Sequence, residues 1–146
     1  MSELGDSLRV ALADTFAMYL KTHNYHWNVE GSDFYEYHKF FNDLYDELWE
    51  AVDAIAEHLR TLDEYAPGSF GRFSELTNIS DATTVPTGVM MAQNLLSDNE
   101  KVMNTLKNAY TQAEKANMVG LSNFLQDRID IHAKHGWMLR STIKNR

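Results

Sequence analysis

A single apolar stripe runs without interruption through residues 34–62. Its members recur at steps of three and four, the spacing that places side chains on one face of an α-helix. They are Phe34, Tyr37, Phe41, Leu44, Leu48, Val52, Ile55, Leu59 and Leu62. The pattern ends at Tyr65–Ala66, because Pro67–Gly68 cannot continue a helix. The spacing therefore predicts one helix of roughly 32 residues, about 48 Å long at a rise of 1.5 Å per residue.

Residues 7–29 carry a second apolar stripe with the same helical spacing, which predicts a helix before the long one. Asp6 or Ser7 is suited to cap its start, since short polar side chains accept hydrogen bonds from the first free N–H groups of a helix. Gly31 is expected to end it, because glycine tolerates the turn that follows a helix. A short connection therefore joins these two predicted helices.

The chain's two prolines, Pro67 and Pro86, bracket the one interval with a weak pattern. That interval has room for a short helix around residues 70–76. Beyond it, apolar stripes predict helices over residues 87–116 and 121–144, with a turn between them. The second half of the chain is thus also predicted to contain two long helices joined by a short connection, and the sequence shows no internal repeat.

Four long helices with no strand pattern predict an all-α four-helix bundle. The two outer connections are short, whereas the middle one, about 20 residues, is long enough to cross the bundle from end to end. One long crossover is the ferritin-like arrangement. A length of 146 residues fits one such domain over residues 1–146, with enough chain to bury a core.

Composition excludes several classes of function. The formal net charge of −8 argues against non-specific nucleic-acid binding, which depends on lysine and arginine neutralising phosphates. Cysteine is absent, so disulfides and thiolate metal sites are excluded. No apolar run is long enough to span a bilayer, and the first residues lack a signal-peptide pattern. A cytoplasmic protein without membrane contact is the resulting prediction.

Two histidines and two carboxylates are the candidate metal ligands, because imidazole nitrogen and carboxylate oxygen suit iron, zinc or manganese. Asp53 and Glu57 are four residues apart on the long helix, so they project from the same face. His38 precedes Asp53 by fifteen residues, a rise of roughly 22 Å along a continuous helix. Ligand atoms lie about 2.0–2.2 Å from a metal. His38 and Asp53 of one chain therefore cannot bind the same ion.

Two interpretations follow. In the first, these residues are unrelated: core histidines and solvated carboxylates. In the second, two copies of the long helix pack antiparallel across a two-fold axis, and the histidine end of one faces the carboxylate end of the other. His26 would then join His38 of the same chain across the Gly31 turn. The usual ferritin pattern, Glu-x-x-His inside one bundle, is absent from the sequence, which favours a site at an interface.

The motifs around these residues resemble one known family. They are His26-Trp27-Asn28, Gly31, Phe34, His38, Tyr45 and Asp53-Ala-Ile-Ala-Glu57, followed near the end by Arg128-Ile-Asp-Ile-His132-Ala-Lys134 and Trp137-Met-Leu-Arg140. Together they resemble the Dps family, the dodecameric mini-ferritins, over most of the chain. The resemblance implies an enzyme, a ferroxidase that oxidises ferrous iron with hydrogen peroxide or oxygen. It also implies a hollow homo-oligomer, a dodecamer built from two-fold dimers, which stores iron and protects against oxidative stress.

The resemblance also implies a ligand set: His26 and His38 from one chain, with Asp53 and Glu57 from its neighbour. The sequence departs from the family at Asn42, where members usually have aspartate. Asparagine offers a neutral oxygen but no charge, so the site is expected to hold one or two irons. The basic N-terminal tail is also missing, which argues against DNA binding. The alternative is a non-enzymatic metal-binding or DNA-compacting cage with weakened ferroxidase activity.

Two other residues have competing interpretations. Trp27, next to a proposed ligand, is either a local electron source or a packing residue. His132 lies on the apolar stripe of the last helix, close to His135, and the pair has a metal-binding interpretation. A packed, hydrogen-bonded core histidine is the favoured interpretation of His132.

Overall fold

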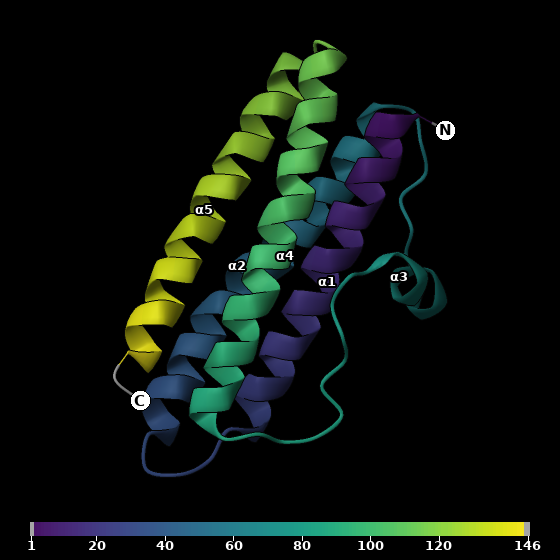
Figure 1. Cartoon of the computed structure of the whole chain (residues 1–146). Helices are drawn as coiled ribbons and strands as arrows, with labels where there is room; N and C mark the ends of the chain where they lie inside the picture. Colours follow the sequence, from purple (N-terminus) through teal and green to yellow (C-terminus); the bar gives the residue numbers. More distant parts are fainter. Residues whose placement is uncertain (1, 145–146) are drawn as a thin grey trace.

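The computed structural model describes residues 2–144 and contains five α-helices, with no strand among those residues. In chain order they are α1 (Glu3–Asn28), α2 (Phe34–Thr61), α3 (Phe70–Leu76), α4 (Gly88–Lys115) and α5 (Val119–Ile143). The four long helices lie side by side (Figure 1). The prediction of an all-α four-helix bundle is confirmed.

The connection from α2 to α4 is a long crossover. It leaves the end of α2 that lies beside the start of α1 and descends along the outside of α1 to the opposite end of the bundle (Figure 1). The predicted short helix, α3, lies within it and packs on α1, where the rings of Phe16 and Phe73 stack at 4.7 Å. Because of this crossover, α2 and α4 run in the same direction.

The start of α1 differs from the sequence prediction. Ser2, rather than Asp6 or Ser7, is the N-cap, and its hydroxyl oxygen accepts a hydrogen bond from the N–H of Gly5 at 2.9 Å. Ser7 lies inside the helix, where its hydroxyl donates to the carbonyl of Leu4. The cap was missed because apolar spacing cannot locate the first turn of a helix when Leu4 is its only apolar residue.

The end of α2 also differs: the helix stops at Thr61, before the predicted end at Tyr65–Ala66. Asp63 takes a left-handed conformation with φ 61°. The N–H groups of Asp63 and Glu64 then turn back to donate to the carbonyls of Arg60 and Leu59. This arrangement closes the helix without glycine, so the apolar pattern alone overestimated its length.

The apolar stripes of the four long helices meet in one core. Its fully buried members include Leu8, Leu12, Met18, Leu44, Leu48, Ile55, Leu95 and Leu106. Each turn of the bundle therefore buries side chains from helices distant in sequence, which is the dominant stabilising term for such a fold. Within residues 2–144, none of the helices combines the length and the apolar character needed to cross a bilayer.

A buried aspartate fastens the crossover to α1. Asp14 is fully buried and accepts three hydrogen bonds, from the Thr77 hydroxyl at 2.7 Å, the Asn78 backbone N–H at 2.7 Å and the Asn78 side-chain amide at 3.1 Å. All three donors follow α3 in the crossover. A buried carboxylate needs such donors, because its desolvation is otherwise costly.

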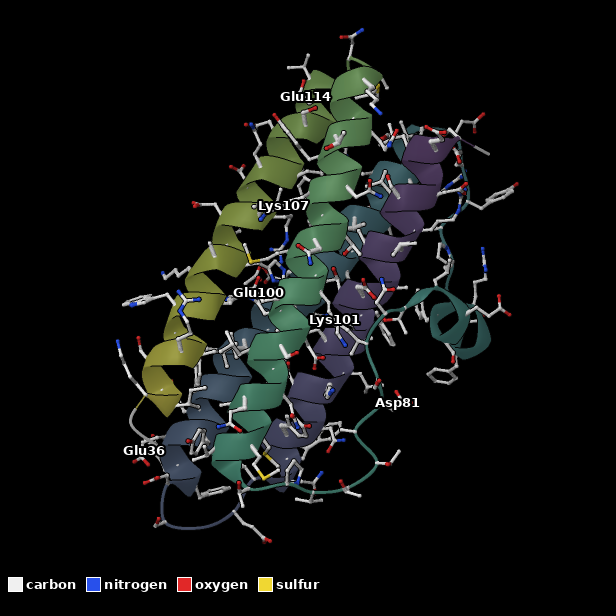
Figure 2. The ribbon with its side chains drawn as sticks, viewed as in Figure 1. Glu36, Asp81, Glu100, Lys101, Lys107 and Glu114 are labelled. Atoms are coloured by element: carbon white, nitrogen blue, oxygen red, sulfur yellow. The ribbon has the colours of Figure 1, made fainter. Side chains whose placement is uncertain are left out.

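We expect Asp14→Ala to lower the free energy of unfolding by about 2 kcal/mol, since it leaves the donors of Thr77 and Asn78 without an acceptor. Amide hydrogen exchange at Asn78 should accelerate in the same variant. Asp81→Ala is the control, because Asp81 is an exposed aspartate of the same crossover (Figure 2). Equal stability of the two variants in denaturant unfolding would contradict the anchoring role.

Candidate metal centre

The turn between α1 and α2 brings His26 and His38 together. His26 lies in the last turn of α1 and His38 near the start of α2. Gly31 adopts φ 112° between them, a conformation that strains other residues. The two imidazole rings stack with centroids 3.8 Å apart and planes 18° apart. The predicted meeting of these histidines across the Gly31 turn is confirmed.

Reciprocal hydrogen bonds fix both imidazoles. His26 Nδ1 lies 2.8 Å from the carbonyl oxygen of His38, and His38 Nδ1 lies 2.7 Å from the carbonyl oxygen of His26. A carbonyl can only accept, so each Nδ1 carries a hydrogen, and each ring in its neutral form presents a lone pair on Nε2. Among residues 2–144, neither Nε2 atom has a hydrogen-bond partner. This tautomer suits metal binding through Nε2, because the other ring nitrogen then donates its hydrogen to a backbone carbonyl.

Asp53 and Glu57 are exposed near the other end of α2. The helix is continuous from Phe34 to Thr61, so fifteen residues still separate His38 from Asp53 by roughly 22 Å. Within one chain, the described residues form no group of three or more histidine or acidic side chains able to hold a metal ion. One chain thus pairs the two histidines and leaves the two carboxylates apart from them.

Asn42 is hydrogen-bonded at both ends of its side chain. Its amide nitrogen donates to Asp46 at 3.1 Å, and its amide oxygen accepts from the Tyr45 hydroxyl at 3.1 Å. To bind a metal, the oxygen of Asn42 would have to share its lone pairs with the Tyr45 hydroxyl. Asn42 is therefore less available than the two Nε2 atoms of the histidine pair.

Aromatic rings surround the histidine pair. The His23 ring lies between Tyr45, with centroids 3.8 Å apart, and Trp27, at 4.0 Å. Burial and the nearby His26 lower the pKa of His23, although Asp46 acts in the opposite direction. Trp27 itself is 59% exposed, so in this chain it covers His23 rather than filling the core.

A second polar group crosses the inside of the bundle and was not predicted as a set. Arg128 and His135 of α5 both bond to Glu47 of α2, and the His135 Nε2 to Glu47 distance is 2.8 Å. Arg128 also donates to His132 Nε2 at 2.9 Å, and His132 Nδ1 donates to the Asn99 side-chain oxygen at 2.7 Å. The favoured interpretation of His132 as a hydrogen-bonded core residue is confirmed.

The pKa values of this group follow from its burial and its partners. Burial alone would raise the pKa of Glu47, but hydrogen bonds from His135 and Arg128 outweigh it and hold the value at about 2. Burial, with the Arg128 charge, lowers the pKa of His132 well below its ordinary value. His132 therefore remains neutral, as its bonds to Arg128 and Asn99 require. The sequence did contain a hint of this group, because Glu47 follows Leu44 by three residues and Arg128 follows Leu125 by three, which places each charged side chain beside the apolar stripe of its helix.

Comparison with known proteins gives concordant matches. A family model described as a ferritin-like domain matches residues 6–146. The chain is 35% identical over 135 residues to an uncharacterized low temperature-induced protein of Nostoc sp., covering 91% of this chain and 75% of that one. It is 31% identical over 145 residues to general stress protein 20U of Bacillus subtilis, covering 97% and 98% of the two chains.

A solved structure gives the same result. The crystal structure of a Dps protein from Vibrio cholerae matches with a TM-score of 0.94 and 27% identity, covering 97% of this chain and 89% of that one. That protein is described as a member of a broad superfamily of ferritin-like diiron-carboxylate proteins. On the family model and on this agreement of sequence and fold, the chain belongs to the ferritin-like family and, within it, to the Dps group.

Proposed function

We propose that this protein is a ferroxidase that oxidises ferrous iron and stores the ferric product inside a hollow assembly of identical chains, protecting against oxidative stress. Each site would take His26 and His38 from one chain and Asp53 and Glu57 from another. The observation that carries the proposal is the histidine pair, whose two Nε2 lone pairs are left unused by the reciprocal bonds to backbone carbonyls. Its substrates are ferrous iron and either hydrogen peroxide or oxygen.

The ligand chemistry fits iron. Two neutral imidazoles and two carboxylates accept both ferrous and ferric ions, because nitrogen and hard oxygen donors together suit iron in either state. The carboxylates of Asp53 and Glu57 supply the negative charge that the histidines lack. The net charge of −8 favours the approach of a cation over that of an anion.

The outer face of α2 supports a shared site. Besides its core stripe, α2 carries a second stripe at helical spacing whose members are exposed or half-exposed, although α1 contacts it at His38, Tyr45 and Trp49. Its members are His38, Asn42, Tyr45, Trp49, Val52, Asp53 and Ala56. Trp49 is 57% exposed and, with Val52, Asp53 and Ala56, lines an open hollow of about 410 Å³. A half-apolar exposed face of this kind is typical of a surface that a partner covers.

The exposed face of α4 offers a contrast. Glu100, Lys107 and Glu114 lie along it, and all are exposed (Figure 2). Charged side chains of alternating sign are typical of a solvated helix face. The second stripe of α2 is different, because it contains histidine, tyrosine, tryptophan and alanine and is therefore partly apolar.

The two halves of the proposed site lie symmetrically on α2. The midpoint between His38 and Asp53 falls between Tyr45 and Asp46. If a two-fold axis crosses α2 there, an antiparallel mate brings its Asp53 beside His38, and the same contact recurs on the other side of the axis. A dimer would hold two identical sites, and six such dimers would make the dodecamer that the family resemblance implies.

Stopped-flow absorbance tests the activity directly. Ferrous iron added with hydrogen peroxide should oxidise faster with the protein than in buffer, and Glu57→Ala should slow this catalysed step by roughly 100-fold, as expected for a lost metal partner. Glu100→Ala, which removes an exposed glutamate of α4, is the control and should match the unmodified protein. Iron oxidation that is no faster with the protein than in buffer would contradict the ferroxidase proposal.

The engagement of Asn42 by Tyr45 and Asp46 supports a second candidate function, a metal-binding cage that does not accelerate oxidation. An aspartate at position 42 would have been a third charged ligand, and its absence weakens a second iron position. Iron retained under anaerobic conditions, combined with an unaccelerated oxidation rate, would favour this candidate. The net charge of −8 argues against its DNA-compacting form.

A further inference from the structure

The guanidinium of Arg128, buried on α5, lies among atoms that are suited to bind a metal ion. Its two terminal nitrogens bond to the two carboxylate oxygens of Glu47, and Nη2 also donates to His132 Nε2 at 2.9 Å. Imidazole nitrogen and carboxylate oxygen are donors that bind iron, cobalt or zinc. Arg128 therefore places a positive charge where Glu47 and His132 could share a metal ion.

His132 is oriented as a metal ligand would be. Its Nδ1 donates to the Asn99 side-chain oxygen at 2.7 Å, which leaves the lone pair on Nε2. The Asn99 amide in turn donates to the His132 carbonyl at 2.9 Å, so the Asn99 side chain is itself fixed. A bond of this kind at the second ring nitrogen sets the tautomer and direction of a metal-binding histidine. His132 and Asn99 are both fully buried, so the lone pair points at Arg128 rather than at water.

The guanidinium does not use all of its own donors in this pocket. Within residues 2–144, the Nε atom of Arg128 is buried and has no hydrogen-bond partner. A buried donor without a partner costs free energy, because it has lost its bonds to water. The acceptors of Glu47 and His132, in contrast, all point at the charge. The pocket therefore matches a cation at its centre better than it matches the whole guanidinium.

A metal ion fits the position of one guanidinium nitrogen. Arg128 Nη2 lies 2.9 Å from His132 Nε2 and 3.1 Å from Glu47 Oε1. Metal–ligand distances for these atoms are about 2.0–2.2 Å, so a shift of about 1 Å by each ligand would close them around an ion. His135, whose ring centroid lies 5.4 Å from that of His132, adds a further imidazole beside the same position.

We propose that the pocket between Glu47 and His132 is a second metal-ion site, which Arg128 fills with its own charge, and that Arg128 thereby determines where this chain binds metal. With Arg128 in place, a divalent cation would have to displace a guanidinium bonded to both carboxylate oxygens, against the repulsion of like charges. Metal binding is then confined to the candidate metal centre. Without Arg128, the pocket takes a divalent ion of the iron, cobalt or zinc class. The inference goes beyond the proposed ferroxidase function, because it concerns binding inside one chain.

Cobalt binding tests the proposal in a chain that lacks the carboxylates of the candidate metal centre. Asp53→Ala and Glu57→Ala together form the background, and Co²⁺ alone is the probe, since its visible absorption reports its ligands. Adding Arg128→Ala should let each chain bind one more Co²⁺ than the background. Arg128→Lys is the matched control, because it keeps the charge, and should bind no more than the background. Asn99→Ala, added to Arg128→Ala, should weaken the new site by roughly 10–100-fold, since it removes the bond that orients the imidazole.

Circular dichroism with and without Zn²⁺ measures whether each variant folds. If Arg128→Ala does not fold alone, Zn²⁺ should restore its helical signal, because the ion replaces the missing charge. A folded Arg128→Ala chain that binds no additional Co²⁺, or one that remains unfolded with Zn²⁺, would overturn the inference. An equal gain in Arg128→Lys, or a gain that survives Glu47→Gln combined with His132→Ala, would overturn it as well. None of these outcomes depends on accelerated iron oxidation, so the inference and the proposed function fail separately.

Discussion

Assemblies that mix His38→Ala chains with Asp53→Ala chains are expected to recover about one quarter of the unmodified ferroxidase activity, although each variant alone is inactive. In a mixed dimer, the intact histidines of the Asp53→Ala chain meet the intact carboxylates of the His38→Ala chain. The other site of that dimer carries both defects. Random pairing makes half of the dimers mixed, and each of these restores one of its two sites.

The experiment refolds the two variants together from denaturant and measures the initial rate of iron oxidation by stopped flow. A mixture of His26→Ala and His38→Ala chains is the matched control. Both changes fall on the same half of the site, so no pairing restores it and the mixture should remain inactive. Recovery in the control, or none in the first mixture, would contradict a site divided between His26–His38 and Asp53–Glu57.

The sequence predicted the elements that depend on periodic burial. Apolar spacing predicted four long helices and their order, because each of them buries one face along its whole length. Gly31 predicted the turn that pairs His26 with His38, since few other residues tolerate φ 112°. The separation of His38 from Asp53 followed from helix geometry alone and persists in the continuous helix α2.

What the sequence could not predict depends on contacts distant along the chain. Asp14 accepts hydrogen bonds from Thr77 and Asn78, more than sixty residues away, and no local pattern specifies that pairing. Glu47 lies beside the apolar stripe of α2, next to Leu48, yet its partners lie on α5. The proposed contact between two copies of α2 is harder still to predict from the sequence, since a single chain contains only one side of it.

Glu47→Ala is expected to lower the free energy of unfolding by about 3 kcal/mol, because it leaves the buried charge of Arg128 without its partner. The Arg128 side chain is only 5% exposed, so water cannot replace the lost carboxylate. His135 loses a hydrogen bond in the same variant. Denaturant unfolding at one fixed protein concentration measures the effect, since the stability of an oligomer depends on concentration.

The Arg72–Glu75 ion pair of α3 provides the control. Its side chains are 43% and 68% exposed, so Glu75→Ala should cost less than about 1 kcal/mol, the usual range of surface pairs. Changing Glu47 and Arg128 together to methionine should restore much of the loss, since no buried charge then remains unpaired. Equal losses in Glu47→Ala and Glu75→Ala would show that the bridge from α2 to α5 contributes no more than a surface pair.

Acid should remove the stability that the Glu47 carboxylate gives to the folded chain. The pKa of Glu47 is about 2 in the folded chain and about 4.5 in its ordinary state, so the folded form binds the proton less tightly than the unfolded form. The stability gained from the carboxylate is therefore complete above about pH 4.5 and is lost as the pH falls toward about 2. Glu47→Gln carries no titrating group, so its stability should approach that of the unmodified protein across this interval. A gap between the two that stays constant from pH 5 to pH 2, roughly the span of the two pKa values, would mean that the Glu47 charge does not stabilise the bundle.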